Sequence, residues 1–407
     1  LREFLMQVGR DVPYYAQLFA SRGFDPAAVQ SVADLSRLPL LDKQDIRANA
    51  ELMKSRRHGP LTRYNTGGSS GQPLVFFIGK ARKSHDVAAK WRATRWWGVD
   101  IGDTEAVIWG SPIEHGTQDR IKALRDRVFR SALLPAFEMS AAQLDQFVAW
   151  IREHRPRMLF GYPSALTFIA RHARERGIRL DNLGIRVAFV TSERLYDEQR
   201  DTIQAVFGCP VANGYGGRDA GFIAHECPSG NMHLTAEDIV VETVGADGLP
   251  TAPGIPGEIV VTHMATGDFP FIRYRTGDVG TLADATCACG RGLPLLKELQ
   301  GRTTDFVVAA DGTVMHGLAL IYVVRDLPGV QAFKVVQHSL TSTELQLVAG
   351  PGFDPACIGT IERGFRARLG NEVQILIQQV DRIAPEKSGK YRYVVSHVAV
   401  GEGGRRA

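Results

Sequence analysis

The chain has 407 residues, of which 44% are hydrophobic and 23% are charged, and its formal net charge is +4 at pH 7. This length predicts two or three domains, and the composition is typical of a folded globular protein. No apolar run reaches the roughly 20 residues of a membrane-spanning helix, and no basic-then-apolar leader follows Leu1. We therefore expect a cytoplasmic protein without a membrane partner.

The positive charge is small and dispersed along the chain. A weak excess of this kind suits an anionic small molecule as well as it suits nucleic acid. No aromatic and basic platform and no groove-reading helix is recognisable, so we expect no nucleic-acid partner.

The first informative segment is a glycine-rich run that precedes a strand predicted over Leu74–Ile78. Glycines let a backbone approach a polyanion closely, and hydroxyls and N–H groups can bind phosphate oxygens. The run lacks the Gly-Lys-Ser/Thr ending of a P-loop. A surface hairpin turn explains the composition equally well, so both interpretations stay open at this point. Its candidate phosphate-binding residues are Thr66, Gly67, Gly68, Ser69, Ser70 and Gly71.

Between residues 140 and 213, short apolar runs alternate with amphipathic segments. Ser140 and Gln143 form a capping box that predicts the first helix of this region. Ser164 is predicted to cap a second helix that ends at Gly177. The predicted strands are 158–160, 186–190 and 211–213, and a third helix is predicted over 195–207. This alternation predicts an α/β fold with a parallel sheet flanked by helices.

From about Glu237 onward the pattern changes to strands without helices. Strands are predicted over 239–242 and 258–261, on either side of a Gly- and Pro-rich turn, which indicates an antiparallel β subdomain appended to the α/β part. A smaller α+β module follows, with strands predicted at 306–308, 313–314, 333–336, 344–348 and 372–380 and a helix capped by Asp354. We place the domain boundary at Asp305, which gives domains 1–304 and 305–407.

Four of the potential metal ligands have a spacing that suggests one site. Cys227 and His233 lie close together in the sequence, and the pair Cys287 and Cys289 follows about fifty residues later. Three thiolates and one imidazole form the closed tetrahedral set that is typical of structural zinc. The alternative is two unrelated polar turns with reduced cysteines.

Four further motifs accompany the glycine-rich run in a fixed order. They are Asn213–Asp219 (NGYGGRD), Tyr274–Asp278 (YRTGD), Gly301–Asp305 (GRTTD) and Pro385–Arg392 (PEKSGKYR). Each motif alone is only moderately specific for a protein family. All five in this order and spacing are highly specific. Together they resemble the adenylate-forming (acyl-CoA synthetase) superfamily, and more narrowly its phenylacetate–CoA ligase and capsule-biosynthesis-protein branch. The resemblance extends from about Val12 to Arg392.

The resemblance implies a large N-terminal adenylation domain and a small mobile C-terminal domain. The glycine-rich run would hold the β- and γ-phosphates of ATP, Gly214, Tyr215 and Gly216 would line the adenine pocket, and Asp278 and Arg302 would contact the ribose. Asp305 would be the hinge between the domains, and Lys390 would reach the α-phosphate and the carboxylate as negative charge builds there. The Cys/His set would brace the β subdomain with Zn²⁺.

Three residues depart from the family pattern. The family usually has Glu at the position of Asp219, the expected Mg²⁺ ligand, and Asp is one methylene shorter but still a hard oxygen donor. Arg218 could assist pyrophosphate binding or pair with Asp219, and Gln72 stands where many relatives have Lys. A degenerate nucleotide-binding protein without catalytic activity is therefore retained as an alternative.

The implied reaction is the ATP- and Mg²⁺-dependent activation of a small carboxylic acid to an acyl-adenylate, followed by transfer to CoA. We prefer an aromatic acid, because Trp109 and Tyr162, together with Ser192 and Glu193, could form the walls of a flat pocket. Amide or ester formation on an amine, sugar or alcohol is the alternative second half-reaction. A homodimer is compatible with the sequence.

Overall fold

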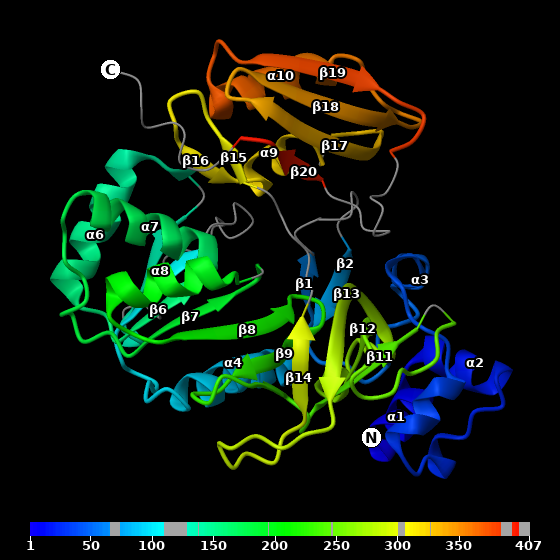
Figure 1. Ribbon diagram of the computed structural model, residues 1–407. Coiled ribbons are helices and arrows are strands. Elements are labelled where there is room, and N and C mark those ends of the chain that lie inside the picture. The colour runs from blue at the N-terminus through cyan, green and yellow to red at the C-terminus, as the bar shows by residue number, and fades with distance from the viewer. Residues whose placement is uncertain are drawn as a thin grey trace.

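The computed structural model describes residues 1–65, 74–109, 128–136, 138–193, 195–245, 247–299, 306–325, 327–383 and 393–398. Predictions that concern other residues lie outside the described part of the chain. Within that part, one large mixed sheet forms the centre of the N-terminal three quarters of the molecule, and a smaller sheet belongs to the C-terminal quarter (Figure 1). An α/β fold is therefore confirmed.

The central sheet has eleven described strands in the order β11-β12-β13-β14-β10-β9-β8-β7-β6-β3-β4. Its parallel half consists of β3 (Glu105–Trp109), β4 (Ser131–Pro135), β6 (Met158–Gly161), β7 (Val187–Thr191) and β8 (Val211–Gly217). Its antiparallel half consists of β9 (Gly221–Glu226), β10 (Met232–Leu234), β11 (Ile239–Val244), β12 (Gly257–His263), β13 (Tyr274–Ala283) and β14 (Leu295–Leu299).

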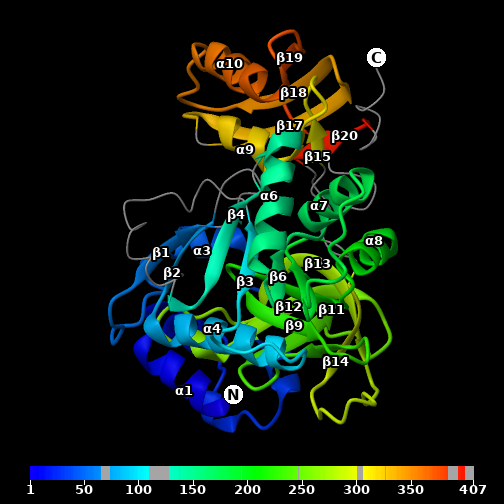
Figure 2. The same ribbon diagram turned by 90° about the vertical axis from the view of Figure 1, so that its left-hand side faces the viewer.

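The parallel strands are buried on both faces, as their continuous apolar sequences require. In β7, Val187 and Phe189 pack toward one core with Ala93 of helix α4 (Lys80–Arg95), whereas Ala188 and Val190 pack into a second core. That second core also contains the apolar faces of α6 (Ala141–His154), α7 (Pro163–Glu175) and α8 (Asp197–Phe207). Figure 2 shows α6 running along this side of the sheet toward the C-terminal unit.

The helix boundaries confirm most of the predictions, with one correction. Ser140 caps α6 by accepting a hydrogen bond from the Gln143 N–H at 3.3 Å, and α8 ends at Gly208 in the left-handed conformation. The second helix is not capped by Ser164, because α7 already begins at Pro163. Proline is favoured at the first helical position, where its missing N–H has no intrahelical partner to lose.

The predicted antiparallel strands are confirmed, and the structure adds that they belong to the same sheet as the parallel strands. β9 pairs antiparallel with β8, so the sheet continues without interruption from its parallel into its antiparallel half. The strand prediction at 211–213 was too short, since β8 extends to Gly217 and carries most of the NGYGGRD motif. The motif therefore begins inside the sheet and leaves it at the Arg218–Asp219 turn.

The N-terminal segment packs against the antiparallel half of the sheet. Its elements are α1 (Arg2–Asp11), α2 (Pro13–Ser21), two 3₁₀ helices (Pro26–Ala28 and Val32–Arg37), α3 (Lys43–Ala48), β1 (Thr62–Asn65) and β2 (Val75–Ile78). β1 and β2 pair antiparallel on either side of residues 66–73, which lie outside the described part. A third 3₁₀ helix, Met264–Thr266, follows β12.

The C-terminal unit has its own hydrophobic core, which contains buried residues from Val307 to Val394. Its elements are β15 (Phe306–Val308), β16 (Val314–His316), α9 (Leu318–Val324), β17 (Val330–Ser339), β18 (Ser342–Ala349), α10 (Cys357–Leu369), β19 (Gln374–Gln379) and β20 (Val394–Ser396). The described backbone joins it to the large unit where β16 pairs with β5 (Glu138–Met139). The predicted boundary residues 304 and 305 lie outside the described part.

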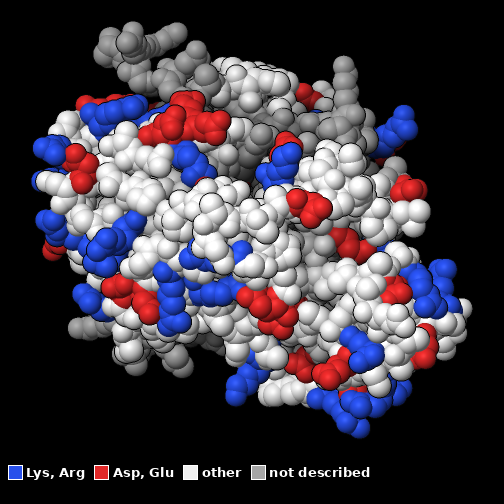
Figure 3. Space-filling view, turned by 60° about the horizontal axis from the view of Figure 1, so that its bottom comes forward, with Lys and Arg blue, Asp and Glu red and all other residues white. Residues whose placement is uncertain are grey.

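The surface of the molecule carries charges of both signs. Figure 3 shows Lys and Arg interspersed with Asp and Glu over the face in view. Elsewhere in the chain, exposed charges form pairs such as Arg95 with Asp100 and Arg275 with Glu258. No helix in the described residues has both the length and the apolar character needed to cross a membrane.

Candidate active site and metal centre

The Arg218–Asp219 turn lies where β8 leaves the central sheet. Both side chains are half-buried. Asp219 accepts two hydrogen bonds, one from the hydroxyl of Tyr274 at 2.6 Å to Oδ2 and one from the Ala220 N–H at 3.0 Å to Oδ1. A carboxylate oxygen can accept more than one hydrogen bond, so both oxygens keep capacity for a cation. The two hydrogen bonds hold the Asp219 carboxyl group in a fixed orientation at the end of the motif.

A second carboxylate is held in the same way on β13. The hydroxyl of Tyr215 lies 3.0 Å from Oδ2 of Asp278 and 3.5 Å from the hydroxyl of Thr276. Asp278 is half-buried, and its own N–H donates to the Thr276 hydroxyl at 3.1 Å. The structure therefore brings together the residue predicted for the adenine pocket and the residue predicted for the ribose.

The glycines of the motif occupy positions that leave no room for a side chain. A Cβ on Gly214 would lie 2.8 Å from the ring of Phe189, and one on Gly216 would lie 2.2 Å from the carbonyl oxygen of Gly221. The second contact is with backbone, which cannot move aside. Gly216 is therefore required for β8 and β9 to approach each other at this point, whereas Gly214 leaves room for the Phe189 ring of β7.

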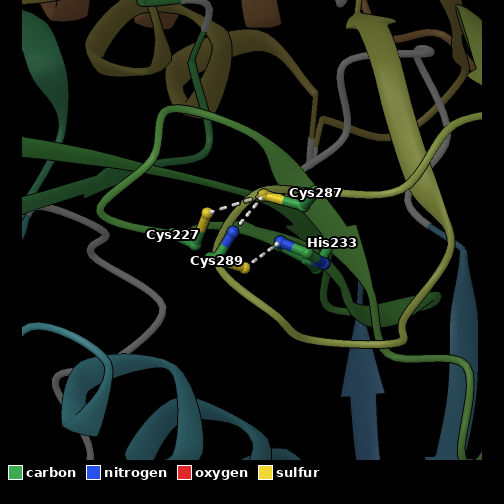
Figure 4. Close-up of side chains that lie close together, drawn as sticks. All are labelled: Cys227, His233, Cys287 and Cys289. Carbon is green, nitrogen blue, oxygen red and sulfur yellow. Dashed lines mark hydrogen bonds between the residues drawn. The ribbon is translucent and has the colours of Figure 1, made fainter.

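Cys227, His233, Cys287 and Cys289 converge on one point, as Figure 4 shows. Their ligand atoms all lie within 4.8 Å of one another. The Sγ atoms of Cys227 and Cys287 are 3.7 Å apart, and Sγ of Cys289 lies 3.3 Å from Nε2 of His233. Zinc–sulfur bonds of about 2.3 Å in a tetrahedron place two sulfurs roughly 3.8 Å apart, so the donor set fits Zn²⁺.

The surroundings of this Cys/His cluster support metal ligation. Burial raises the pKa of the Cys289 thiol, but hydrogen bonds from Arg291 and the neighbouring cysteines outweigh that effect and lower the pKa to about 6. Cys289 is thus available as a thiolate near neutral pH, the form that binds metal. Trp96 packs edge-on against His233 at a ring separation of 5.6 Å, and the Arg291 guanidinium lies over the same indole.

The four residues predicted for the acid pocket lie at neighbouring strand ends. Trp109 and Tyr162 stack with a ring separation of 4.4 Å, and Tyr162 is buried. Glu193 follows β7 and accepts a 3.4 Å hydrogen bond from the Ser164 N–H at the start of α7. Ser192 is exposed and has a positive φ of 73°. A cavity of about 430 Å³ lies elsewhere, along α4, and none of the four residues lines it.

The comparisons with known proteins agree with this geometry. Residues 307–397 match the family described as CapK C-terminal domain. Protein CapK of Staphylococcus aureus is 22% identical over 400 residues, which cover 97% of this chain and 87% of that protein. A phenylacetate-coenzyme A ligase of Thermus thermophilus is 24% identical over 315 residues, covering 76% of this chain and 70% of the ligase. The chain is a relative of CapK and the phenylacetate–coenzyme A ligases.

A solved structure of a CoA ligase has a similar fold. A crystal structure of 2-hydroxyisobutyryl-CoA ligase in complex with 2-HIB-AMP and CoA superposes with a TM-score of 0.65 and 20% identity, covering 97% of this chain and 89% of that one. The predicted resemblance to the adenylate-forming superfamily, and to its CapK and phenylacetate–CoA ligase branch, is thereby confirmed.

Several residues that the CapK-like motifs single out lie outside the described part of the chain. They are Thr66, Gly67, Gly68, Ser69, Ser70, Gly71, Gln72, Arg302, Asp305 and Lys390. Their predicted roles stay predictions.

Sequence reasoning missed two residues of this candidate site. Tyr274 belongs to a quoted motif, but nothing in the sequence indicated that its hydroxyl reaches Asp219. Arg82 was not considered, because it is separated from Arg218 by 136 positions, yet its guanidinium contacts the turn that carries Asp219. In an alignment of related sequences, residue types at both positions that vary together with Asp219 would be the signal that could identify them.

Proposed function

We propose that this chain is an AMP-forming acid–thiol ligase that uses ATP and Mg²⁺ to activate a small carboxylic acid and then transfers the acyl group to CoA. The observation that carries the proposal is the pair of carboxylates, Asp219 and Asp278, each oriented by a tyrosine hydroxyl at the end of the central sheet. Two fixed carboxylates suit a ligand that carries both a metal-bound polyphosphate and a ribose diol.

The nucleotide would lie along the Asn213–Asp219 motif. Asp278 would accept hydrogen bonds from the ribose hydroxyls, and Arg302 would contact the same sugar. Tyr215 would contribute to the adenine pocket together with Gly214 and Gly216. Residues Thr66–Gly71 would hold the β- and γ-phosphates through their hydroxyls and N–H groups.

Asp219 would hold Mg²⁺, which prefers carboxylate oxygens and keeps several of its waters. The residues present fit this ion, because two hydrogen bonds hold the Asp219 carboxylate and its oxygens retain acceptor capacity. When bound, the ion would neutralise phosphate charge. Arg218, at the same turn, would supply a further positive charge toward pyrophosphate.

Lys390 would stabilise the negative charge that develops when the carboxylate attacks the α-phosphate. A cation delivered by a small domain can be withdrawn after the first half-reaction, which exposes the adenylate to its acceptor. This assignment divides the chain into an adenylation domain (1–304) and a C-terminal domain (305–407), with Asp305 as the hinge. The separate core of the C-terminal unit supports such a division.

The Cys/His cluster would bind one structural Zn²⁺. A closed set of three thiolates and one imidazole leaves no position for a reactive water, so it would brace β9, β10 and the loop before β14 and take no part in the chemistry. The acid itself we propose to be aromatic, since the stacked pair Trp109 and Tyr162 presents flat apolar surface near the end of β3.

The test is carboxylate-dependent release of pyrophosphate from ATP with Mg²⁺, over a panel of aromatic and aliphatic acids and without acceptor. We expect activity with at least one acid and its loss in Lys390→Ala, with ATP affinity retained. A Lys390→Ala variant that forms adenylate normally would remove the lysine from the mechanism. No release with any acid, despite demonstrated ATP binding, would favour the degenerate nucleotide-binding alternative.

A further inference from the structure

We infer that Arg82 is a positioning residue for the proposed magnesium site, an inference that rests on the proposed function. Arg82 lies in the first turn of α4, and its side chain is only 2% exposed. All three nitrogens of its guanidinium donate hydrogen bonds. Nε reaches both carboxylate oxygens of Asp86 at 2.9 and 3.0 Å. Nη1 reaches the carbonyl oxygen of Asp219 at 3.2 Å, and Nη2 that of Arg218 at 3.3 Å.

These contacts join helix α4 to the Arg218–Asp219 turn, and the proposed chemistry requires a fixed relative position of the two. Helix α4 follows β2 directly, and β2 follows residues 66–73, the proposed phosphate-binding run. The Arg218–Asp219 turn carries the proposed Mg²⁺ ligand. Mg²⁺ would tolerate little error in the position of its protein ligand, because this ion demands near-octahedral geometry with short bonds. Arg82 ties the backbone of the turn to the first turn of α4.

The local packing shows why an arginine is needed at this position. Asp86 lies one helical turn after Arg82 and holds the guanidinium in a fixed orientation from its own helix. Gly221, just beyond the turn, leaves room for two neighbouring side chains: a Cβ there would lie 2.8 Å from Nε2 of His263 and 3.1 Å from Nη2 of Arg82. A lysine offers one nitrogen on a flexible stem and cannot serve the carboxylate and two carbonyls together.

Arg82 and Tyr274 therefore act on Asp219 through different atoms. Tyr274 fixes the carboxylate through Oδ2, whereas Arg82 fixes the backbone through the carbonyl oxygens of the turn. Residues that orient a metal ligand from outside the coordination sphere typically change metal affinity about 10- to 100-fold when replaced. The expected effect of losing Arg82 is thus on the affinity for the metal and not on the affinity for the acid.

The experiment measures binding of Mn²⁺, as a spectroscopic substitute for Mg²⁺, to the full-length protein in the presence of saturating ATP. Electron paramagnetic resonance reports free Mn²⁺ without requiring turnover. We expect Arg82→Lys to weaken Mn²⁺ binding about tenfold, with less than a twofold change in the KM of the acid. Arg95→Lys is the matched control, because Arg95 lies on the same helix and bonds a carboxylate, Asp100, through Nε at 2.7 Å but is exposed.

A second variant guards against misfolding. Arg82→Met combined with Asp86→Asn removes the guanidinium without leaving an unpaired carboxylate, and it should show the same loss of Mn²⁺ affinity. Folding of each variant is checked by circular dichroism and thermal melting.

The outcomes separate the two proposals. A folded Arg82→Lys protein with wild-type Mn²⁺ affinity overturns the inference while the proposed function stands, as does a lowered melting temperature with unchanged Mn²⁺ affinity. Failure of both Arg82 variants to fold also overturns it, because the residue is then structural. A wild-type protein that binds no Mn²⁺ with ATP overturns the proposed function and this inference with it.

Discussion

The hydroxyl of Tyr274 lies 2.6 Å from Oδ2 of Asp219 and donates a hydrogen bond to it across 55 positions of sequence. The ring of Tyr274 is fully buried and stacks on Phe271 at 4.9 Å, so the hydroxyl has little freedom to move. The residue before it, Arg273, has a positive φ of 52° and a guanidinium that binds the backbone of the N-terminal segment. The packing of Tyr274 therefore fixes the hydroxyl group that orients Asp219.

Tyr274→Phe removes this hydroxyl and leaves the ring in place. We expect the half-saturating Mg²⁺ concentration in pyrophosphate release to rise about tenfold, because the carboxylate loses the group that orients it. Steady-state kinetics at varied free Mg²⁺ measures the change. Tyr14→Phe, at a half-buried tyrosine on α2, is the control and should behave as wild type. Unchanged Mg²⁺ dependence in Tyr274→Phe would show that the hydrogen bond does not matter for metal binding.

Asp278→Asn is expected to raise the KM for ATP about tenfold with a smaller change in the KM of the acid, since hydrogen bonds to a charged group contribute about 1.5–3 kcal/mol. Isothermal titration with a non-hydrolysable ATP analogue measures the same loss directly. Glu258→Gln, at an exposed ion pair with Arg275 on the neighbouring strand, is the matched control. Equal ATP affinity in Asp278→Asn and wild type would exclude Asp278 from the nucleotide site.

Cys287→Ser should lower the zinc content of the purified protein from about one ion per chain to a trace, because a closed Cys₃His site loses a ligand. Metal analysis by mass spectrometry and thermal melting with and without a chelator are the measurements. Cys357→Ser, a half-buried position on α10 away from the cluster, should retain the metal. A wild-type protein that contains no zinc and is unaffected by chelators would contradict the proposed structural zinc site.

His225 should make the fold sensitive to acid. Burial, with additional effects of Arg92 and His85, lowers its pKa to about 3, and neither ring nitrogen has a hydrogen-bond partner among the described residues. The unfolded chain titrates near 6.5. Below that pH the unfolded state binds a proton that the folded state does not, so stability is complete above about pH 6.5 and falls as the pH is lowered toward 3.

The variant His225→Phe tests the predicted direction of this pH dependence of stability. The ring stacks on Phe222 at 5.3 Å, so a phenyl group fits the surroundings without adding a titratable site. Relative to wild type, the variant should gain about 2 kcal/mol in free energy of unfolding between pH 7.5 and pH 5. Urea unfolding at the two pH values measures the gain, with the exposed His154→Phe as control. An equal difference at both pH values would contradict the assigned shift.

Much of the fold could be predicted from the sequence because the patterns that specify it are local. The buried strands 158–161 and 187–191 and the glycine that ends α8 were recognisable from apolar runs and helix-stop residues. The start of α7 was misplaced because Pro163 and Ser164 both favour a helix N-terminus, and only the backbone shows which one begins it. The continuity of the sheet could not be predicted, since it depends on the pairing of β9 with β8.

The residues of the candidate site also fall into two groups, those that the sequence predicts and those that only the fold brings together. Tyr215 and Asp278 were found because each lies in a short motif, although 63 positions separate them. The contacts of Arg82 and Tyr274 with the Asp219 turn are made between distant segments, and their residue types are common on any helix or strand. Such residues become visible only when the fold brings their polar atoms to the motif.

The most direct test of the account is oxygen transfer from the acid to the nucleotide. An acid that supports pyrophosphate release is labelled with ¹⁸O in both carboxylate oxygens, and the reaction is completed with CoA before AMP is examined by mass spectrometry. If the carboxylate attacks the α-phosphate, one ¹⁸O appears in AMP and the thioester retains the other. Formation of ADP, or of AMP without ¹⁸O, would contradict activation through an acyl-adenylate.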